Sequence, residues 1–354
     1  MINSRKRILI SFIILVLSIL TVAAAVFVYQ IKTKLDKMII PESSLIESAI
    51  DSKQYPSKRE DQPISEDGDF YVLLMGLDHR DGHDALLTDT LMVMHIIPSE
   101  AIIKLLSIPR DLLVKNVHGK NVKINSMFYE GYILSREKTQ QDPSILTGDI
   151  VSLGSTKLDK AELSGAMANT RHTIEELLDL NIDHMILVNL DTLKRLVDEV
   201  GGIEIDVKRS MKYKETNLYL EPGLQLLDGD KALGYARFRQ DDRGPRYFIS
   251  DFERGNNQQD VVKALASKIL SWKNSTKALR LLDIISDSVK TDLDYYEMYS
   301  MVKYSYSIFK SNSFVSIKFP EYYNQEGEVI IPDEALKDLR RAFQEVNIRE
   351  DNQP

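Results

Sequence analysis

The sequence predicts an α/β protein, with a mixed sheet covered by helices, preceded by one transmembrane helix at the N-terminus. The first observation is an apolar run of 21 uncharged residues at positions 8–28. The second is that short apolar runs, typical of buried strands, alternate with helical periodicity from residue 70 onward, too irregularly for a doubly wound fold. The third is composition: 354 residues, 43% hydrophobic and 28% charged, can bury a core and exclude a mainly disordered or fibrous chain.

The apolar run Ile8–Val28 is long enough to cross a bilayer. At a rise of about 1.5 Å per residue it spans roughly the 30 Å of hydrocarbon. Arg5, Lys6 and Arg7 precede it, so the positive-inside rule places the N-terminus in the cytoplasm and the rest outside. A cleaved signal peptide is the alternative, because Ala23–Ala25 offers small residues to a peptidase. The apolar core of such a peptide is usually only about 7–15 residues, so an uncleaved anchor is favoured.

These boundaries give the domain organisation of a single-pass cell-membrane protein. The predicted parts are a cytoplasmic tail (1–7), the anchor (8–28), an extracytoplasmic stalk (29–68), a folded domain (69–346) and a frayed tail (347–354). The stalk is polar, contains Pro41, Pro56 and Pro63, and ends in an acidic run just before the first strand. The chain has no cysteine, which excludes disulfides, thiolate zinc sites and a cysteine nucleophile.

The domain begins with three predicted strands. Phe70–Met75 is a continuous apolar run ended by Gly76, and Leu91–Ile97 and Ala101–Ile108 flank a hairpin turn at Pro98–Glu100. Residues 131–160 are polar and show little apolar periodicity, which predicts a long surface insertion.

The rest of the domain alternates helices with strands. The predicted elements, in order, are a helix over Thr170–Leu180, a strand over His184–Asn189, a helix capped by Asp191 and ended at Gly201-Gly202, a strand over Ile203–Val207, helices from residue 254 to Phe309, a strand over Phe314–Phe319 and a final helix capped by Asp333.

Four short stretches concentrate charge beside apolar strands. They are Gly76–Arg80; Thr88–Thr90; Ser107–Asp111 with Lys123–Asn125; and Arg237–Arg239 with Asp251, Arg254, Gln258 and Gln259. Any one of them is explained by turn residues or surface ion pairs. Together they supply carboxylates, which suit Mg²⁺, and arginine forks, which suit phosphate oxygens. The combination is what a magnesium-bridged pyrophosphate needs.

The motifs carry a resemblance to a known family. They are Gly76-x-Asp78-x-Arg80, Asp89-Thr90, Ser107-Ile108-Pro109-Arg110-Asp111, Lys123-Ile124-Asn125, Val200-Gly201-Gly202, Leu227-Asp228-Gly229-x-x-Ala232-Leu233-x-Tyr235-Ala236-Arg237-x-Arg239 and Asp251-Phe252-x-Arg254-x-x-x-Gln258-Gln259. In this order, the set resembles the LytR-CpsA-Psr family of Gram-positive envelope proteins. The resemblance implies a phosphotransferase that moves a glycopolymer, of the wall teichoic acid or capsule type, from a polyprenyl-pyrophosphate carrier in the membrane to peptidoglycan.

The resemblance also implies roles for individual residues. Asp78 and Asp89 would hold Mg²⁺, and Asp251 would orient an arginine. The residues implied to bind the pyrophosphate are Arg80, Arg110, Lys123, Arg237, Arg239, Arg254 and Gln258; Asp251 and all of these arginines form the predicted catalytic set. Arginines gathered in an acidic region repel one another unless an anion lies between them, so we expect an electrostatically strained site without ligand.

Two departures from the family pattern lie near the predicted site. Asn257 stands where an arginine normally precedes the paired glutamines, and the stretch between Arg239 and Asp251 is lengthened, adding Arg243 and Arg246. Those two arginines could replace the missing charge or be solvated loop residues. The departures favour, as the alternative function, a non-catalytic envelope protein that binds polyprenyl phosphates or wall polymer.

Nucleic-acid binding is disfavoured by charge and by the predicted topology. Residues 38–354 carry 39 basic and 52 acidic side chains, a net charge of −13. A DNA-binding domain would be basic.

Overall fold

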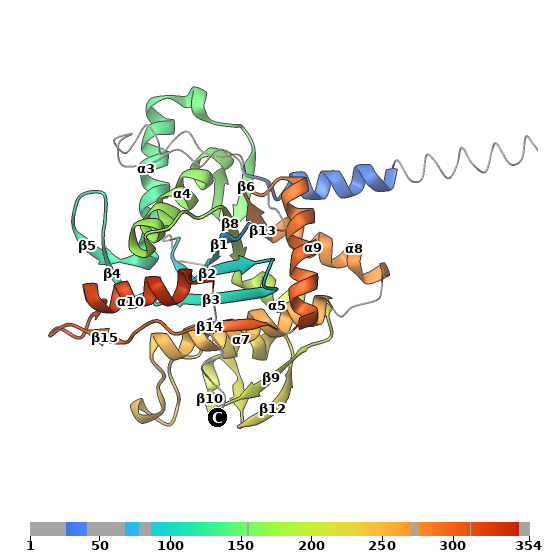
Figure 1. Cartoon of the computed structure of the whole chain (residues 1–354). Helices are drawn as coiled ribbons and strands as arrows, with labels where there is room; N and C mark the ends of the chain where they lie inside the picture. Colours follow the sequence, from blue (N-terminus) through green and yellow to red (C-terminus); the bar gives the residue numbers. More distant parts are fainter. Residues whose placement is uncertain are drawn as a thin grey trace, which may run out of the picture.

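The computed structural model describes residues 26–40, 68–77, 86–153, 156–270, 275–311 and 313–346. A six-stranded sheet in the order β13-β8-β1-β2-β3-β14 forms its centre (Figure 1). The strands are β1 Phe70–Leu77, β2 Thr88–Ile97, β3 Ile102–Ile108, β8 His184–Asn189, β13 Val289–Thr291 and β14 Phe314–Ile317. The β1–β8 and β3–β14 pairs are parallel and the other three pairs are antiparallel. The predicted mixed α/β fold is therefore confirmed.

Both faces of the sheet are covered, which explains why its strands are continuous apolar runs. Alternate residues of β1, such as Leu73 and Met75, belong to the core formed with helices α3 (Met127–Gln141), α4 (Lys160–Leu178) and α10 (Asp333–Gln344). The intervening residue Val72 belongs to a second core, formed with α7 (Asp251–Leu270) and α9 (Tyr295–Ser311). This alternation follows from the two-residue period of a strand.

A smaller unit with its own core lies beside the sheet. It contains α5 (Leu190–Glu199), α6 (Gly229–Arg237), α8 (Ser275–Ser288) and the antiparallel pairs β9–β12 (Ile203–Val207, Gly223–Leu227) and β10–β11 (Met211–Tyr213, Leu218–Leu220). Helix α7 links this unit to the central sheet, because its residue Val261 packs in the small core and Val262 packs under the sheet.

Three short hairpins complete the domain: β4–β5 (Leu113–Lys115, Asn121–Lys123), β6–β7 (Ile150–Leu153, Thr156–Asp159) and β15–β16 (Tyr322–Tyr323, Val329–Ile330). Within the described ranges, none of the helices has the length and apolarity needed to cross a membrane. Most of the predicted anchor and stalk, and all of the predicted tails at 1–7 and 347–354, lie outside those ranges.

The prediction of a surface insertion at 131–160 is wrong for residues 131–141, whereas residues 142–150 are mostly exposed. Helix α3 occupies most of the first half, and its residues Gly131, Ser135 and Thr139 are buried against α4. Their spacing of four places them on one helix face. A Cβ on Gly131 would lie 2.6 Å from the Cβ of Asn169, so only glycine permits this approach of the two helices. The seam is built from small residues, and an apolar-periodicity criterion does not detect it.

The predicted boundaries of four other helical regions also need correction. Helix α4 begins ten residues before Thr170, because Asp159 and Glu162 form a reciprocal capping box. Asn189, not Asp191, caps α5, and Pro332 rather than Asp333 occupies the N-cap of α10. The helical stretch predicted from residue 254 is interrupted by β13, a three-residue edge strand too short to show a period.

Candidate functional site

Asp251 is the centre of the polar cluster at the carboxyl end of β3. It is the first residue of α7, whose start is fixed by Ser250 and Glu253: the Glu253 backbone N–H donates to Ser250 Oγ at 3.1 Å, and the Ser250 N–H donates to Glu253 Oε2 at 3.1 Å. This capping box orients the first turn. The Asp251 side chain is only 3% exposed. The helix dipole stabilises a negatively charged carboxylate at this position, in the first turn of the helix.

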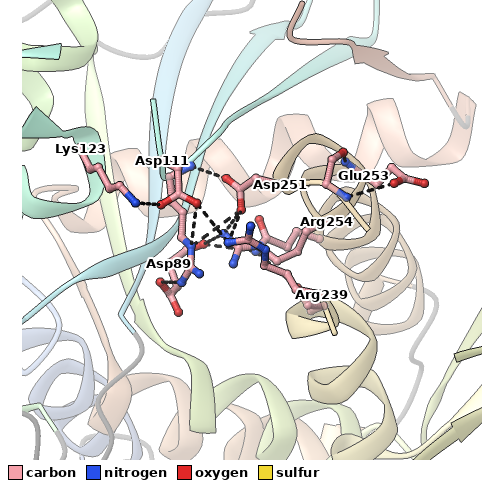
Figure 2. A network of polar contacts seen from close by, with 11 residues as sticks. Asp89, Asp111, Lys123, Arg239, Asp251, Glu253 and Arg254 are labelled. Carbon is pink, nitrogen blue, oxygen red and sulfur yellow. Dashed lines mark hydrogen bonds and ion pairs between the residues drawn. The ribbon is translucent and has the colours of Figure 1, made fainter. Parts of the chain in front are cut away.

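Three arginines from separate segments surround the Asp251 carboxylate (Figure 2). Arg254 Nη2 lies 2.7 Å from Asp251 Oδ1, and Arg110 Nε and Arg239 Nη1 each lie 3.8 Å from the same oxygen. The backbone N–H of Arg110 donates to Asp251 Oδ2 at 2.6 Å. Asp251 therefore holds α7, the end of β3 and the segment after α6 together.

Two further carboxylates complete the network. Arg110 Nη1 donates to Asp89 Oδ1 at 2.6 Å, and Arg239 Nη1 donates to Asp111 Oδ2 at 3.1 Å. Lys123 Nζ donates to the other oxygen of Asp111 at 2.9 Å. Four cations and three carboxylates thus alternate in one connected cluster (Figure 2).

Burial and the neighbouring charges shift the pKa values of several members of the cluster. Burial lowers the pKa of Arg254, and the charges of Arg110 and Arg239 add to this effect, outweighing Asp251 and Asp89. Burial alone would raise the pKa of Asp111, but the hydrogen bond from Lys123 and the charges of Arg110 and Arg239 lower it. Cations therefore dominate around Asp111, whereas the lowered pKa of Arg254 comes mainly from burial. Burial would lower the pKa of Arg110 too, but the carboxylates of Asp89, Asp251 and Asp111 raise it.

Local packing explains the spacing of residues inside two of the motifs. Gly76 of β1 faces Thr90 of β2, and a Cβ on Gly76 would lie 2.8 Å from the Thr90 Cβ. This close approach of β1 and β2 fixes the position of the first residues of β2, including Asp89. Ile124 is fully buried, and its N–H donates to the Leu112 carbonyl at 2.8 Å, which fixes Lys123 beside Asp111.

The other predicted site residues have different positions. Asp78 and Arg80 lie outside the described residues. Arg237 is the last residue of α6, two residues before Arg239, and is half-buried. Gln258 is buried and donates to the Asp89 carbonyl at 3.4 Å, so it supports the backbone of β2.

The two departures from the family pattern do not restore a cation to the cluster. Asn257 Nδ2 donates to the Tyr235 carbonyl at 3.2 Å, which ties α7 to α6. Arg243 Nη2 pairs with the buried Asp241 at 2.7 Å, and its guanidinium stacks 4.2 Å from the Tyr247 ring centre. Arg246 is exposed on the same loop.

Two aspects of the site escaped sequence reasoning. Asp111 stands inside a recognised motif, yet it received no role; its position after Arg110 was the available signal. The expectation that the arginines lie without anionic partners is wrong for Arg110, Arg239 and Arg254, because Asp89, Asp111 and Asp251 pair with them. A cavity of about 170 Å³ adjoins the cluster and is lined by Arg254, Gln259 and Lys318 among others.

Comparisons with known proteins show which proteins this chain is similar to. The chain is 33% identical over 233 residues to the polyisoprenyl-teichoic acid–peptidoglycan teichoic acid transferase TagU of Halalkalibacterium halodurans, covering 65% of this chain and 63% of the relative, just under two thirds of its length. It is 26% identical to the TagU of Bacillus anthracis over 94% of this chain and 96% of that one. The crystal structure of Bacillus subtilis TagV superposes with a TM-score of 0.56 and 25% identity, covering 78% of this chain and 96% of that chain. The model of the LytR_cpsA_psr family matches residues 40–342, and the chain belongs to this family.

Proposed function

We propose that the chain is a membrane-anchored phosphotransferase that attaches a glycopolymer from a polyprenyl-pyrophosphate carrier to peptidoglycan. The observation that carries the proposal is the cluster of Arg110, Lys123, Arg239 and Arg254 around Asp251 and Asp111. Guanidinium forks bind phosphate oxygens in two-point contacts, and four cations suit two adjacent phosphates. The names of the H. halodurans and B. anthracis relatives favour a teichoic acid as the polymer.

The reaction requires stabilisation of charge more than covalent participation by the protein. A hydroxyl oxygen of the acceptor sugar would attack the phosphorus that carries the polymer, and the bond from this phosphorus to the bridging oxygen would break. Polyprenyl phosphate would leave with the bridging oxygen, and the hydroxyl proton would pass to solvent. Negative charge grows on the leaving phosphate, so Arg110, Arg239 and Arg254 would act by neutralising it in place.

The carboxylates proposed as metal ligands, Asp89 and Asp78, are compatible with Mg²⁺. Asp89 presents a carboxylate, 15% exposed, at the edge of the arginine cluster, and Asp78 is the second proposed ligand. Within the described part of the chain no group of three or more His, Asp or Glu residues is arranged for a metal. Mg²⁺ needs only one or two carboxylates when substrate phosphates fill its other positions. When bound, it would supply further neutralisation of the phosphate oxygens.

Residues 8–28 are proposed as the membrane anchor, with the domain outside the cell membrane. A reporter fused after Pro354 should be active outside, and the chain should stay with the membrane fraction. Release of a shortened soluble form would show cleavage near Ala23–Ala25 and contradict the anchor.

Transfer is tested with the full-length chain in detergent, a polyprenyl-pyrophosphate-linked teichoic acid and peptidoglycan. We expect a polymer–peptidoglycan phosphodiester with the wild type and with Arg246→Ala, whose side chain is exposed on the neighbouring loop. Arg239→Ala should abolish the product, because it removes one of the cations proposed to neutralise the pyrophosphate. This cation lies beside Asp111 and Asp251. Full transfer by Arg239→Ala would refute the assignment.

A second candidate function is supported by Asn257 and Arg243. Asn257 bonds the carbonyl of Tyr235 and Arg243 bonds Asp241, so neither supplies the charge that the family pattern places beside the paired glutamines. Such a site could bind lipid pyrophosphate without transferring it, as an envelope protein with a binding or regulatory role would. Wild-type protein that binds the lipid pyrophosphate but forms no phosphodiester, under conditions where the B. subtilis TagV relative does, would favour this candidate.

A further inference from the structure

Helix α9 presents a stripe of exposed aromatic side chains. Tyr295, Tyr299, Val302 and Tyr306 follow one another at spacings of four, three and four, which places them on one face, and they are 40–67% exposed. Tyr296 flanks the stripe and is 62% exposed. The opposite face of α9 is buried under the sheet through Tyr304 and Ile308. This buried face packs α9 onto the domain, while the stripe faces outward.

The chain reaches α9 directly from the predicted anchor. Residues 26–36 form a helix that projects from the domain beside α8 and α9 (Figure 1). Its end is fixed to the domain: the hydroxyl of Tyr295 contacts Asp36, and Lys37 Nζ lies 3.3 Å from Asp287. The Ile40 N–H donates to the Thr291 carbonyl at 2.7 Å, so the link continues into β13.

Helix geometry sets the height of this attachment above the bilayer. The uncharged run ends at Val28, eight residues before Asp36. Eight residues of helix rise about 12 Å, and a headgroup layer is roughly 5–8 Å thick on each side of the hydrocarbon. Asp36, and the stripe that begins at Tyr295, would then lie at the outer side of the headgroups, within reach of tyrosine side chains.

We propose that the stripe Tyr295, Tyr299, Val302 and Tyr306, flanked by Tyr296, rests on the headgroup layer of the membrane in which the chain is anchored. The inference rests on the anchor proposed above. Tyrosine suits this layer because it has an apolar ring and a polar tip. Lys303 on α9 and Lys32 on the helix over residues 26–36 are exposed, and they add attraction to anionic lipids.

This orientation directs the polar cluster away from the membrane. Helix α9 joins β13 to β14, and β14 begins beside Ile103, near the start of β3. Arg110 follows the other end of β3, seven residues long, so about 20 Å of strand separates the two ends. The cluster would face the wall, where the acceptor lies, and the lipid carrier would have to rise out of the bilayer to reach it.

Fluorescence depth measurements on the full-length chain test the proposal. Trp272 is the only tryptophan of the chain, so Trp272→Phe gives a silent background. Into it we would place Tyr299→Trp as the probe and Tyr322→Trp as the control, since Tyr322 is 44% exposed on β15 at the far side of the domain from α9 (Figure 1). Each is reconstituted at one chain per nanodisc of phosphatidylcholine and phosphatidylglycerol, with and without lipid brominated near the carbonyl.

The expected result is strong quenching of the Tyr299→Trp probe by brominated lipid and several-fold weaker quenching by aqueous acrylamide than for the Tyr322→Trp control. Equal acrylamide quenching of probe and control would overturn the proposal. So would shielding that appears only when two chains share a disc, since a second copy would then cover the stripe. A chain that fails to stay in the disc would overturn the anchor and this inference together, whereas the transfer assay would still report on the proposed reaction.

Discussion

Two of the three arginines around Asp251, Arg254 and Arg239, should differ sharply in their contribution to stability. Arg254 is 5% exposed and pairs at 2.7 Å with an Asp251 side chain that is 3% exposed. Removing one partner of a buried pair costs about 3–5 kcal/mol, because the other charge stays buried. Arg110 and Arg239 remain 3.8 Å from Asp251, so we expect the lower end for Arg254→Ala, about 3 kcal/mol.

Arg239→Ala should cost much less. Its side chain is 34% exposed, and its partner Asp111 keeps the hydrogen bond from Lys123 at 2.9 Å. Exposed pairs contribute about 0–1 kcal/mol. At about 2–4 °C per kcal/mol for a domain of this kind, Arg254→Ala should lower the Tm by roughly 6–12 °C and Arg239→Ala by at most about 4 °C.

Thermal unfolding of the full-length chain in detergent, with and without pyrophosphate, measures both effects. Pyrophosphate should raise the Tm of the wild type by mass action, and of Arg246→Ala equally. Both cluster variants should lose most of that rise. Equal destabilisation by Arg254→Ala and Arg239→Ala, or an undiminished pyrophosphate shift in either, would refute the assignment of the cluster as a pre-paired anion site.

Three other perturbations probe separate features. Asp89→Asn should leave the fold intact and abolish magnesium-dependent turnover, and an unchanged response to magnesium titration would contradict its role as a ligand. Hydrogen bonds from Arg243 lower the pKa of Asp241 below its ordinary value, so the pair stabilises the fold at neutral pH and this contribution is lost as pH falls below about 4. Asp241→Asn should therefore cost about 1–3 kcal/mol at pH 7 by denaturant unfolding, with the difference narrowing in acid; a difference independent of pH would oppose this account. Gly131→Ala should destabilise by about 1–3 kcal/mol, because its Cβ would meet Asn169 at 2.6 Å, and a neutral effect would show that α3 can shift.

The central sheet could be predicted from the sequence because its strands are buried on both faces. Apolar runs such as Phe70–Met75 and His184–Asn189 have no other plausible place than a covered sheet, and the structure gives both as strands. Helix α3 could not be predicted in this way, since its buried seam consists of Gly131, Ser135 and Thr139. Glycine, serine and threonine have low helix propensity, so a sequence pattern containing them predicts a loop. Their contribution to packing is seen only in the structure, where α4 lies against them.

The sequence predicted which residues form the candidate site, but not which arginine pairs with which carboxylate. The order of the motifs along the sequence predicted Arg110, Arg239, Arg254 and Asp251 as site residues, and the structure brings these four together. The arginine contacts of Asp251 depend on how α7 starts, and the Ser250–Glu253 capping box fixes that start. Asp111 became visible only through its contacts, because charge in a loop motif does not distinguish a solvated carboxylate from one locked between two cations.

The alternation of carboxylates and cations has a consequence for selectivity and release. Each described arginine of the cluster is already bound to a carboxylate, so a phosphate would bind by displacing an anion rather than by displacing water. Such an exchange favours ligands with densely packed negative charge, and two joined phosphates would compete better than one. Once transfer divides the pyrophosphate between two molecules, each fragment would compete alone, and Asp89, Asp111 and Asp251 could reclaim their arginines. Product expulsion would then be driven by the carboxylates of the protein itself, without any movement of the backbone.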